Sequence, residues 1–338
     1  MVAIGIALAL LQARPEMPSD DSGTIVANGT EPEIINVVAA RSAFPFVQRW
    51  VAQYNNDPDS AGRVEIGYYL DEPTVPGDLI LAGRIHNASD LRYIPVSAQA
   101  AAVVYNIPSF PDIPSGLRLN ATLLSQIFNG TITRWDDPAI KDLNEGLNLP
   151  SERIVVVHES SRGSTLTLVE NYLSTDIRWQ ANSVRVMGPD ELATTIRTTP
   201  YSIGCVDFSY AIQTRMTFAA IENPGGEFVL PSVDSIDQAV NSSLVVRNFT
   251  EISQSDAIFL NTSMIGNSSY PITGLYYAGL YGNASNATTD FVEWIIDQDG
   301  GQQVLTEVQY PSIYERNKQL ATYARAVVNS TAPEATKG

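Results

Sequence analysis

The residues with the clearest binding chemistry lie where a strand, a polar loop and a helix follow one another. Ile154–Val157 is a run of β-branched residues typical of a strand buried on both faces. The polar loop His158–Ser164 leads into a helix predicted over Thr165–Leu173, which has apolar residues at helical spacing. Backbone N–H groups at the start of a helix lack partners within the helix, and the helix dipole adds positive potential. The pattern therefore predicts an anion-binding loop, a kind of loop that many α/β proteins share.

The sequence contains no comparable pattern for catalysis or for metal binding. The sequence has no Gly-X-Ser-X-Gly, P-loop or His-Glu-X-X-His motif, and His158 with its neighbouring serines lacks a third partner for a Ser/His site. Two histidines and one cysteine leave too few ligands for a transition metal. We therefore predict a non-enzyme with no metal and no cofactor, and we expect Cys205 to be a small buried apolar residue.

The adjacent carboxylates Asp136 and Asp137 have a simpler explanation than acid–base chemistry. Neighbouring residues at a helix start point in different directions, so the two carboxylates do not face one reacting group. Asp137 instead precedes Pro138, which fits the first position of a helix. We predict that Asp137 caps that helix.

The elements that must position these residues alternate between strand and helix patterns, which predicts an α/β fold with mixed sheets flanked by helices. The predicted strands are Ile34–Ala39, Val64–Ile66, Ile154–Val157, Ser202–Phe208 and Pro271–Leu280. The predicted helices are Ala43–Tyr54, Leu123–Phe128, Thr165–Leu173, Glu191–Arg197, Thr289–Gln298 and Val304–Ala326.

Composition limits the classes of partner. The chain has 338 residues with 44% apolar content, which is enough for a large core. Lys and Arg total 20 against 37 Asp and Glu, which gives a net charge of −17. A surface this acidic repels nucleic acid and anionic lipid, so we expect neither as a partner.

The N-terminal segment is apolar but short. Residues 2–11 carry no charge, yet about ten residues are too few to span a bilayer, so no transmembrane span is predicted. The segment fits the core of a signal peptide, with a cleavage site near Ala13. Alternatively, residues 1–13 pack against a neighbouring subunit and drive self-association. Residues 14–33 have the composition of a linker.

Eleven Asn-X-Ser/Thr sequons predict a secreted or cell-surface glycoprotein that carries N-linked glycans. A polar surface with accidental sequons is the alternative explanation. The acceptor residues are Asn28, Asn87, Asn120, Asn129, Asn241, Asn248, Asn261, Asn267, Asn283, Asn286 and Asn329.

Several motifs resemble the periplasmic phosphate-binding proteins, the solute receptors of ABC-type phosphate importers. They are Ala43–Pro45 with Trp50 and Tyr54, Val104–Pro108, Trp135–Asp137, Ala139–Ile140, Leu143–Asn144, Gly146–Leu147, Leu149–Ser151, Ser202–Gly204 and Tyr270–Thr273. The resemblance implies a two-lobed fold of type II, in which two crossover segments join the lobes and a ligand lies between them. By this resemblance residues 1–33 precede the lobes, residues 34–103 with 270–328 form lobe 1, residues 104–269 form lobe 2, and residues 329–338 form a tail.

The family's ligand residues are poorly matched. The resemblance places Ala43 and Phe44 in the first ligand loop, Gly67–Tyr69 in the second, and His86 where the family has a buried Asp. Glu159 falls at the position of the family's phosphate-binding Arg. Replacing that bidentate Arg removes an interaction worth about 1.5–3 kcal/mol and adds repulsion. Only Ser164, Thr165 and the backbone N–H groups keep their expected role.

Three arginines beside the cleft loops leave two interpretations open. Arg41, Arg84 and Arg162 can form a rebuilt pocket for an anion, or they can pair with Glu159 and lock the lobes together. The degraded site, the sequons and the apolar end favour a structural, self-assembling subunit of a surface structure or filament. The alternative is a soluble binding protein for phosphate or another small oxyanion.

Overall fold

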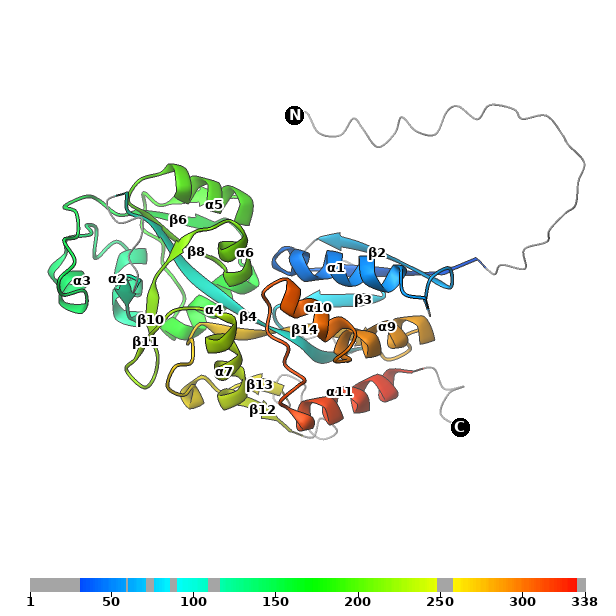
Figure 1. Ribbon diagram of the computed structural model, residues 1–338. Helices are drawn as coiled ribbons and strands as arrows, with labels where there is room; N and C mark the ends of the chain where they lie inside the picture. The colour runs from blue at the N-terminus through cyan, green and yellow to red at the C-terminus, as the bar shows by residue number, and fades with distance from the viewer. Residues whose placement is uncertain are drawn as a thin grey trace, which may run out of the picture. The chain divides into compact units, whose positions relative to one another are not determined.

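A mixed sheet of nine strands runs through the part of the chain that the structure describes, in the order β2-β1-β3-β14-β4-β8-β6-β7 with β9 beside β4. The computed structural model describes residues 31–58, 60–70, 76–85, 90–108, 116–247 and 258–332. The apolar segment and most of the predicted linker lie outside these ranges. Residues Pro32–Gly338 form one unit in which helices flank the sheet (Figure 1).

The long strand β4 (Leu91–Asn106) connects the two halves of this sheet. Its residues Leu91–Ala100 pair antiparallel with β14 (Thr273–Tyr281), whereas Ala101–Asn106 pair antiparallel with β8 (Ser202–Asp207). Nearly every residue of β4 is buried, because both faces are covered and the strand is an apolar run. Figure 1 shows β4 passing from the half around β3 to the half around β8.

The half of the sheet around β1 builds the first lobe. Strands β2 and β3 both pair parallel with β1, and the rings of Phe46, Trp50, Tyr276 and Tyr310 form an aromatic core beside them. Trp50 Nε1 donates to Gly301 O at 2.7 Å, which fixes the tryptophan in that core. The elements are β1 (Glu33–Ala39), η1 (Arg41–Ala43), α1 (Phe44–Asn55), β2 (Val64–Leu70), β3 (Leu79–Ala82), α9 (Asn286–Ile296), α10 (Gly301–Glu307) and α11 (Lys318–Thr331).

The half around β8 builds the second lobe. Its parallel strands β6, β7 and β8 are each followed by a helix, α4, α5 and α6. These are β6 (Val155–Glu159), α4 (Ser164–Leu173), β7 (Val184–Val186), α5 (Pro189–Thr198) and α6 (Phe208–Gln213). The smaller elements are β5 (Arg118–Leu119), α2 (Ala121–Phe128), α3 (Pro138–Leu143), β9 (Thr217–Phe218), β10 (Ala220–Glu222), β11 (Phe228–Val229), α7 (Val233–Ser243), β12 (Leu244–Val246), β13 (Ile258–Leu260) and η2 (Thr262–Met264).

The predicted fold class and most predicted elements are confirmed, with two local corrections. His158 and Glu159 belong to strand β6, so the polar loop is shorter than predicted. The helix predicted over Val304–Ala326 is two helices, because Pro311 lacks the N–H that a continuous helix needs. Asp137 caps α3 as predicted and accepts a hydrogen bond from Ala139 N at 3.0 Å. The residue bounds of the two lobes stay a prediction.

Candidate functional site

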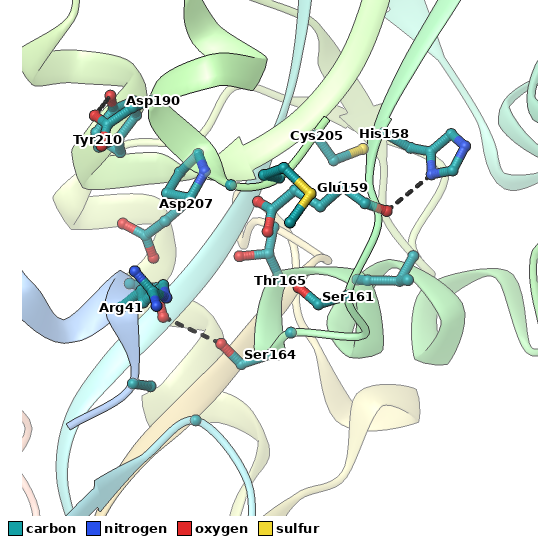
Figure 2. Close-up of a pocket in the computed structure, with 18 of the residues that line it drawn as sticks. Arg41, His158, Glu159, Ser161, Ser164, Thr165, Asp190, Cys205, Asp207 and Tyr210 are labelled. Atoms are coloured by element: carbon teal, nitrogen blue, oxygen red, sulfur yellow. Dashed lines mark hydrogen bonds between the residues drawn. The ribbon is translucent and has the colours of Figure 1, made fainter. Parts of the chain in front are cut away.

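A cavity of about 810 Å³ lies where the carboxyl ends of two sets of three parallel strands meet. The residues Leu70 of β2 and Glu159 of β6 end their strands and line it. The residues that follow β1, β3 and β7 line it as well, and so does Asp207 at the end of β8. Ligands of open α/β sheets bind at this edge of the sheet, beyond the carboxyl ends of the strands. The topology therefore marks this cavity as the candidate site (Figure 2).

The start of helix α4 faces the cavity, as the sequence predicts for an anion-binding loop. Gly163 is the N-cap residue and provides no side chain to cap the first N–H groups of the helix. Gly163, Ser164 and Thr165 all line the cavity. Ser164 Oγ lies 3.3 Å from Ser42 Oγ, which follows β1, so the two lobes touch here (Figure 2). The loop therefore combines free helix N–H groups with a contact between the lobes.

The predicted cationic residues have different positions. Arg41 and Arg84 line the cavity, and neither forms an ion pair with another residue that the structure describes. Arg162 does not line the cavity, because its guanidinium pairs with Glu170 at 2.6 Å and Asp176 at 2.9 Å. The cavity lining therefore does not support the predicted place of Arg162 in the cleft, which stays a prediction.

The remaining predicted ligand residues also differ in position. Phe44 lines the cavity and is 39% exposed, whereas Ala43 is fully buried and does not line it. Ala43 therefore supports the wall rather than the site. His86 lies outside the described residues, so its role in the site stays a prediction.

Sequence reasoning identified Glu159 but missed three further carboxylates in the cavity wall. Asp190 and Glu191 begin helix α5, and Asp207 ends strand β8. Asp190 accepts a hydrogen bond from the phenol of Tyr210, and Glu191 Oε2 accepts one from Met187 N at 2.8 Å. Glu159 was identified through the resemblance, whereas the position of these three carboxylates at or shortly after the carboxyl end of a strand is the signal that could have identified them.

Asp207 is a buried carboxylate at the contact between the lobes. It accepts hydrogen bonds from Tyr310 at 3.0 Å, Tyr276 at 3.2 Å and Ser209 N at 3.0 Å. The single O–H of Tyr310 is shared between Asp207 and Ser42 O, which lies 3.1 Å away in η1. Burial raises the pKa of Asp207 to about 6, although these hydrogen bonds oppose the shift. Asp207 therefore changes charge near neutral pH while it faces the cavity.

His158 and Cys205 line the cavity but offer it little polar capacity. His158 stacks on Trp179 with ring centroids 4.2 Å apart, and its ring nitrogens face Glu159 O at 2.9 Å and Ser183 Oγ at 3.1 Å. Burial lowers the pKa of His158, which favours the neutral ring. Cys205 is half-buried rather than buried as predicted, and desolvation raises the pKa of its thiol to about 12. A protonated thiol of this kind is a poor nucleophile.

The sequons of the described residues occupy the surface or its edge. Asn120 and Asn261 are half-buried and cap α2 and η2. The exposed acceptors are Asn129, Asn241, Asn267, Asn283, Asn286 and Asn329. The acceptors Asn28, Asn87 and Asn248 lie outside the described residues. The exposed positions permit glycosylation, which stays a prediction.

Two classes of feature are missing from the described residues. They contain no group of three or more His, Cys, Asp or Glu side chains that could hold a metal ion. None of the helices within the described ranges is long and apolar enough to cross a membrane.

Comparisons with known proteins point in one direction. Residues 80–299 match the family model of the PBP superfamily domain. Phosphate-binding protein PstS from Pasteurella multocida is 32% identical over 227 residues, which cover 62% of this chain and 64% of that protein, slightly under two thirds of its length. Phosphate-binding protein PstS from Xylella fastidiosa is 26% identical over 328 residues, which cover 86% of this chain and 85% of that protein.

A solved structure with a similar fold comes from Stenotrophomonas maltophilia and is described as a phosphate-binding protein. It aligns with a TM-score of 0.58 at 13% identity and covers 90% of this chain and 97% of that chain. At this identity the likeness concerns the fold alone. It confirms the two-lobed architecture that the sequence motifs predicted.

Proposed function

Because the chain belongs to the PBP superfamily, we propose that it binds a small oxyanion in the cavity between its two lobes, with phosphate as the first candidate. The observation that carries this proposal is the convergence of Arg41, Arg84 and the open start of α4 on one cavity. Two guanidinium groups and free helix N–H groups are the donors that an oxyanion needs. The PstS relatives, which are phosphate-binding proteins by name, support the same choice.

The carboxylates of the wall limit the affinity that we propose. Glu159 lines the cavity at the position where the resemblance expects an arginine. A carboxylate there removes a charge-assisted contact of about 1.5–3 kcal/mol, which corresponds to a loss of roughly tenfold to more than a hundredfold in affinity. We therefore propose micromolar or weaker binding rather than tight capture of phosphate.

Titration calorimetry with inorganic phosphate tests the proposal. Arg41→Ala removes a guanidinium that has no ion-pair partner among the described residues, so we expect at least tenfold weaker binding, or about 1.4 kcal/mol. Arg49→Ala is the matched control, because Arg49 pairs with Glu307 at 2.8 Å and does not line the cavity. If the unaltered protein shows no heat of binding at millimolar phosphate, the proposal is wrong.

A structural, self-assembling subunit was the function favoured by the sequence pattern. The comparisons favour the binding protein instead, since the relatives that match are binding proteins. Residues 1–13, which the assembly hypothesis requires, lie outside the described residues. We keep assembly as the second candidate because the apolar segment favours it. Export of the chain and attachment of glycans are part of either proposal.

Catalysis is not part of our proposal. The matching relatives are binding proteins, and the polar groups in the wall, such as Asp207 and His158, have hydrogen-bond partners within the protein. Desolvation raises the pKa of the Cys205 thiol, so it is not activated. That the chain is not an enzyme stays a prediction.

A further inference from the structure

The cavity is far larger than an inorganic oxyanion, and we propose that it binds an organic oxyanion, in which a tetrahedral anionic head carries an apolar body of about one aromatic ring. The inference rests on the proposed function, because the head occupies the same anion site. The cavity measures about 810 Å³. A water molecule takes about 30 Å³ in the liquid, so a tetrahedral anion of five heavy atoms takes on the order of 150 Å³. Most of the cavity is left for the rest of the ligand.

The volume does not result from lobes that stand apart. Ser42 and Ser164 come from opposite lobes, and their hydroxyl oxygens lie 3.3 Å apart. Ser209 Oγ donates to Gln309 O at 3.2 Å across the same boundary. Gly83 packs so closely against Ser164 that it leaves no room for a Cβ atom. The lobes are therefore in contact at several points while the cavity keeps its size.

Many side chains of the cavity wall are apolar. Six of its side chains are Phe44, Leu70, Leu166, Ile177, Trp179 and Met187. Met187 is 79% exposed and Phe44 is 39% exposed, so protein atoms leave most of Met187 and more than a third of Phe44 uncovered. Pockets for organic ligands combine such apolar walls with a few polar groups that orient the ligand. An apolar ligand body would cover these side chains and remove them from water.

The charges of the cavity limit the affinity that an anionic head alone can gain. Arg41 and Arg84 are its cationic side chains, whereas Glu159, Asp190, Glu191 and Asp207 are carboxylic. A free phosphate depends on cationic contacts, and these carboxylates oppose them. An organic anion gains additional affinity from apolar burial, which carboxylates at the anion site do not oppose. In Figure 2 Asp207 lies between Arg41 and the Asp190–Tyr210 pair, and all of these residues line the cavity.

Calorimetry on the full chain with two matched pairs of probes tests this inference. Phenyl phosphate is compared with inorganic phosphate, and benzenesulfonate with sulfate, so that each pair differs by the ring. We expect each phenyl compound to bind at least tenfold more tightly than its inorganic partner, or about 1.4 kcal/mol. If phosphate binds as tightly as phenyl phosphate, the inference is wrong, whereas the proposed function still holds. If none of the four anions binds, both proposals fall.

A variant of the wall tests where the ring lies. Met187→Ser should lower the ratio of phenyl phosphate affinity to phosphate affinity at least threefold, because it replaces an apolar wall side chain by a polar one. Met264→Ser is the matched control: Met264 is 55% exposed, does not line the cavity, and its variant should leave the ratio unchanged. An unchanged ratio in Met187→Ser overturns the assignment of this wall to the ring.

Discussion

Asp207 shows how a single residue links the cavity to the contact between the lobes. Its carboxylate faces the cavity, is 5% exposed, and accepts hydrogen bonds from Tyr276 and Tyr310 of the first lobe. Desolvation of the charged form exceeds the stabilisation by these donors, so the pKa rises to about 6. The protonated carboxyl is therefore the more stable form at this contact in mildly acidic solution.

We predict that Asp207→Asn changes the pH dependence of stability. Between the ordinary aspartate pKa of 3.8, which applies to the unfolded chain, and the folded pKa of about 6, the folded chain holds a proton that the unfolded chain releases. The stability of the unaltered protein therefore falls as pH rises through this window. Relative to Asp207→Asn, which does not titrate, it should lose about 2 kcal/mol from about pH 4 to about pH 7. Urea unfolding at a series of pH values measures this, and parallel curves for both proteins contradict it.

At the scale of elements, the site depends on the close packing of strands and helices in the second lobe. Strand β8 lies between β4 and β6, and helix α5 packs on it. Gly204 in β8 permits this arrangement, since a Cβ atom there would lie 2.6 Å from Val157 O and 3.2 Å from Ile196 Cδ1. The glycine thus keeps β6 and α5, which carry Glu159 and Asp190, at their positions in the cavity wall.

Gly204→Ala should therefore destabilise the protein by about 1–3 kcal/mol, because the methyl group overpacks a backbone contact. Gly67→Ala in β2 is the matched control, since a Cβ atom at Gly67 meets nothing within 4 Å. Replacing a strand glycine by alanine at an open position should be neutral or slightly stabilising. Chemical denaturation of the two variants measures the difference, and equal midpoints would falsify this packing argument.

At the scale of the whole molecule, the net charge of −17 and the N-terminal segment bear on association. A chain this acidic repels its own copies in solution, so self-assembly needs a specific apolar contact. The uncharged residues 2–11 are the segment that the sequence offers for it. If the segment is instead a signal peptide, the binding function alone remains.

The assembly hypothesis makes one prediction for the whole chain. Deleting residues 1–13 should convert an assembly into monomers, because the apolar contact is lost while the lobes are unaffected. Light scattering of the full and shortened chains, at matched concentration and salt, measures the mass of each. A monomer before and after the deletion contradicts assembly and leaves the anion-binding proposal untouched.

Much of the fold was predictable because the signals are local. The β-branched run at Ile154–Val157 and the helical spacing before Phe128 reflect burial patterns that neighbouring residues determine. Asp137 caps its helix through Ala139, two residues away. The end of β6 was misplaced because His158 and Glu159 are polar, yet the parallel partner β7 extends the strand through both. The β-propensity of single residues carries no information about a partner strand.

The sequence by itself therefore predicted most of the elements, the two-lobed fold and a polar loop that leads into the start of α4. Only the tertiary structure decided which charges share the cavity. The guanidinium of Arg162 pairs with Glu170 and Asp176, whereas Arg41 lines the cavity. Asp207 lines the cavity and accepts a hydrogen bond from Tyr310, which lies 103 residues away in the chain. The physical reason is that side chains meet through contacts between distant segments, which strand order and lobe packing fix and local sequence patterns do not contain.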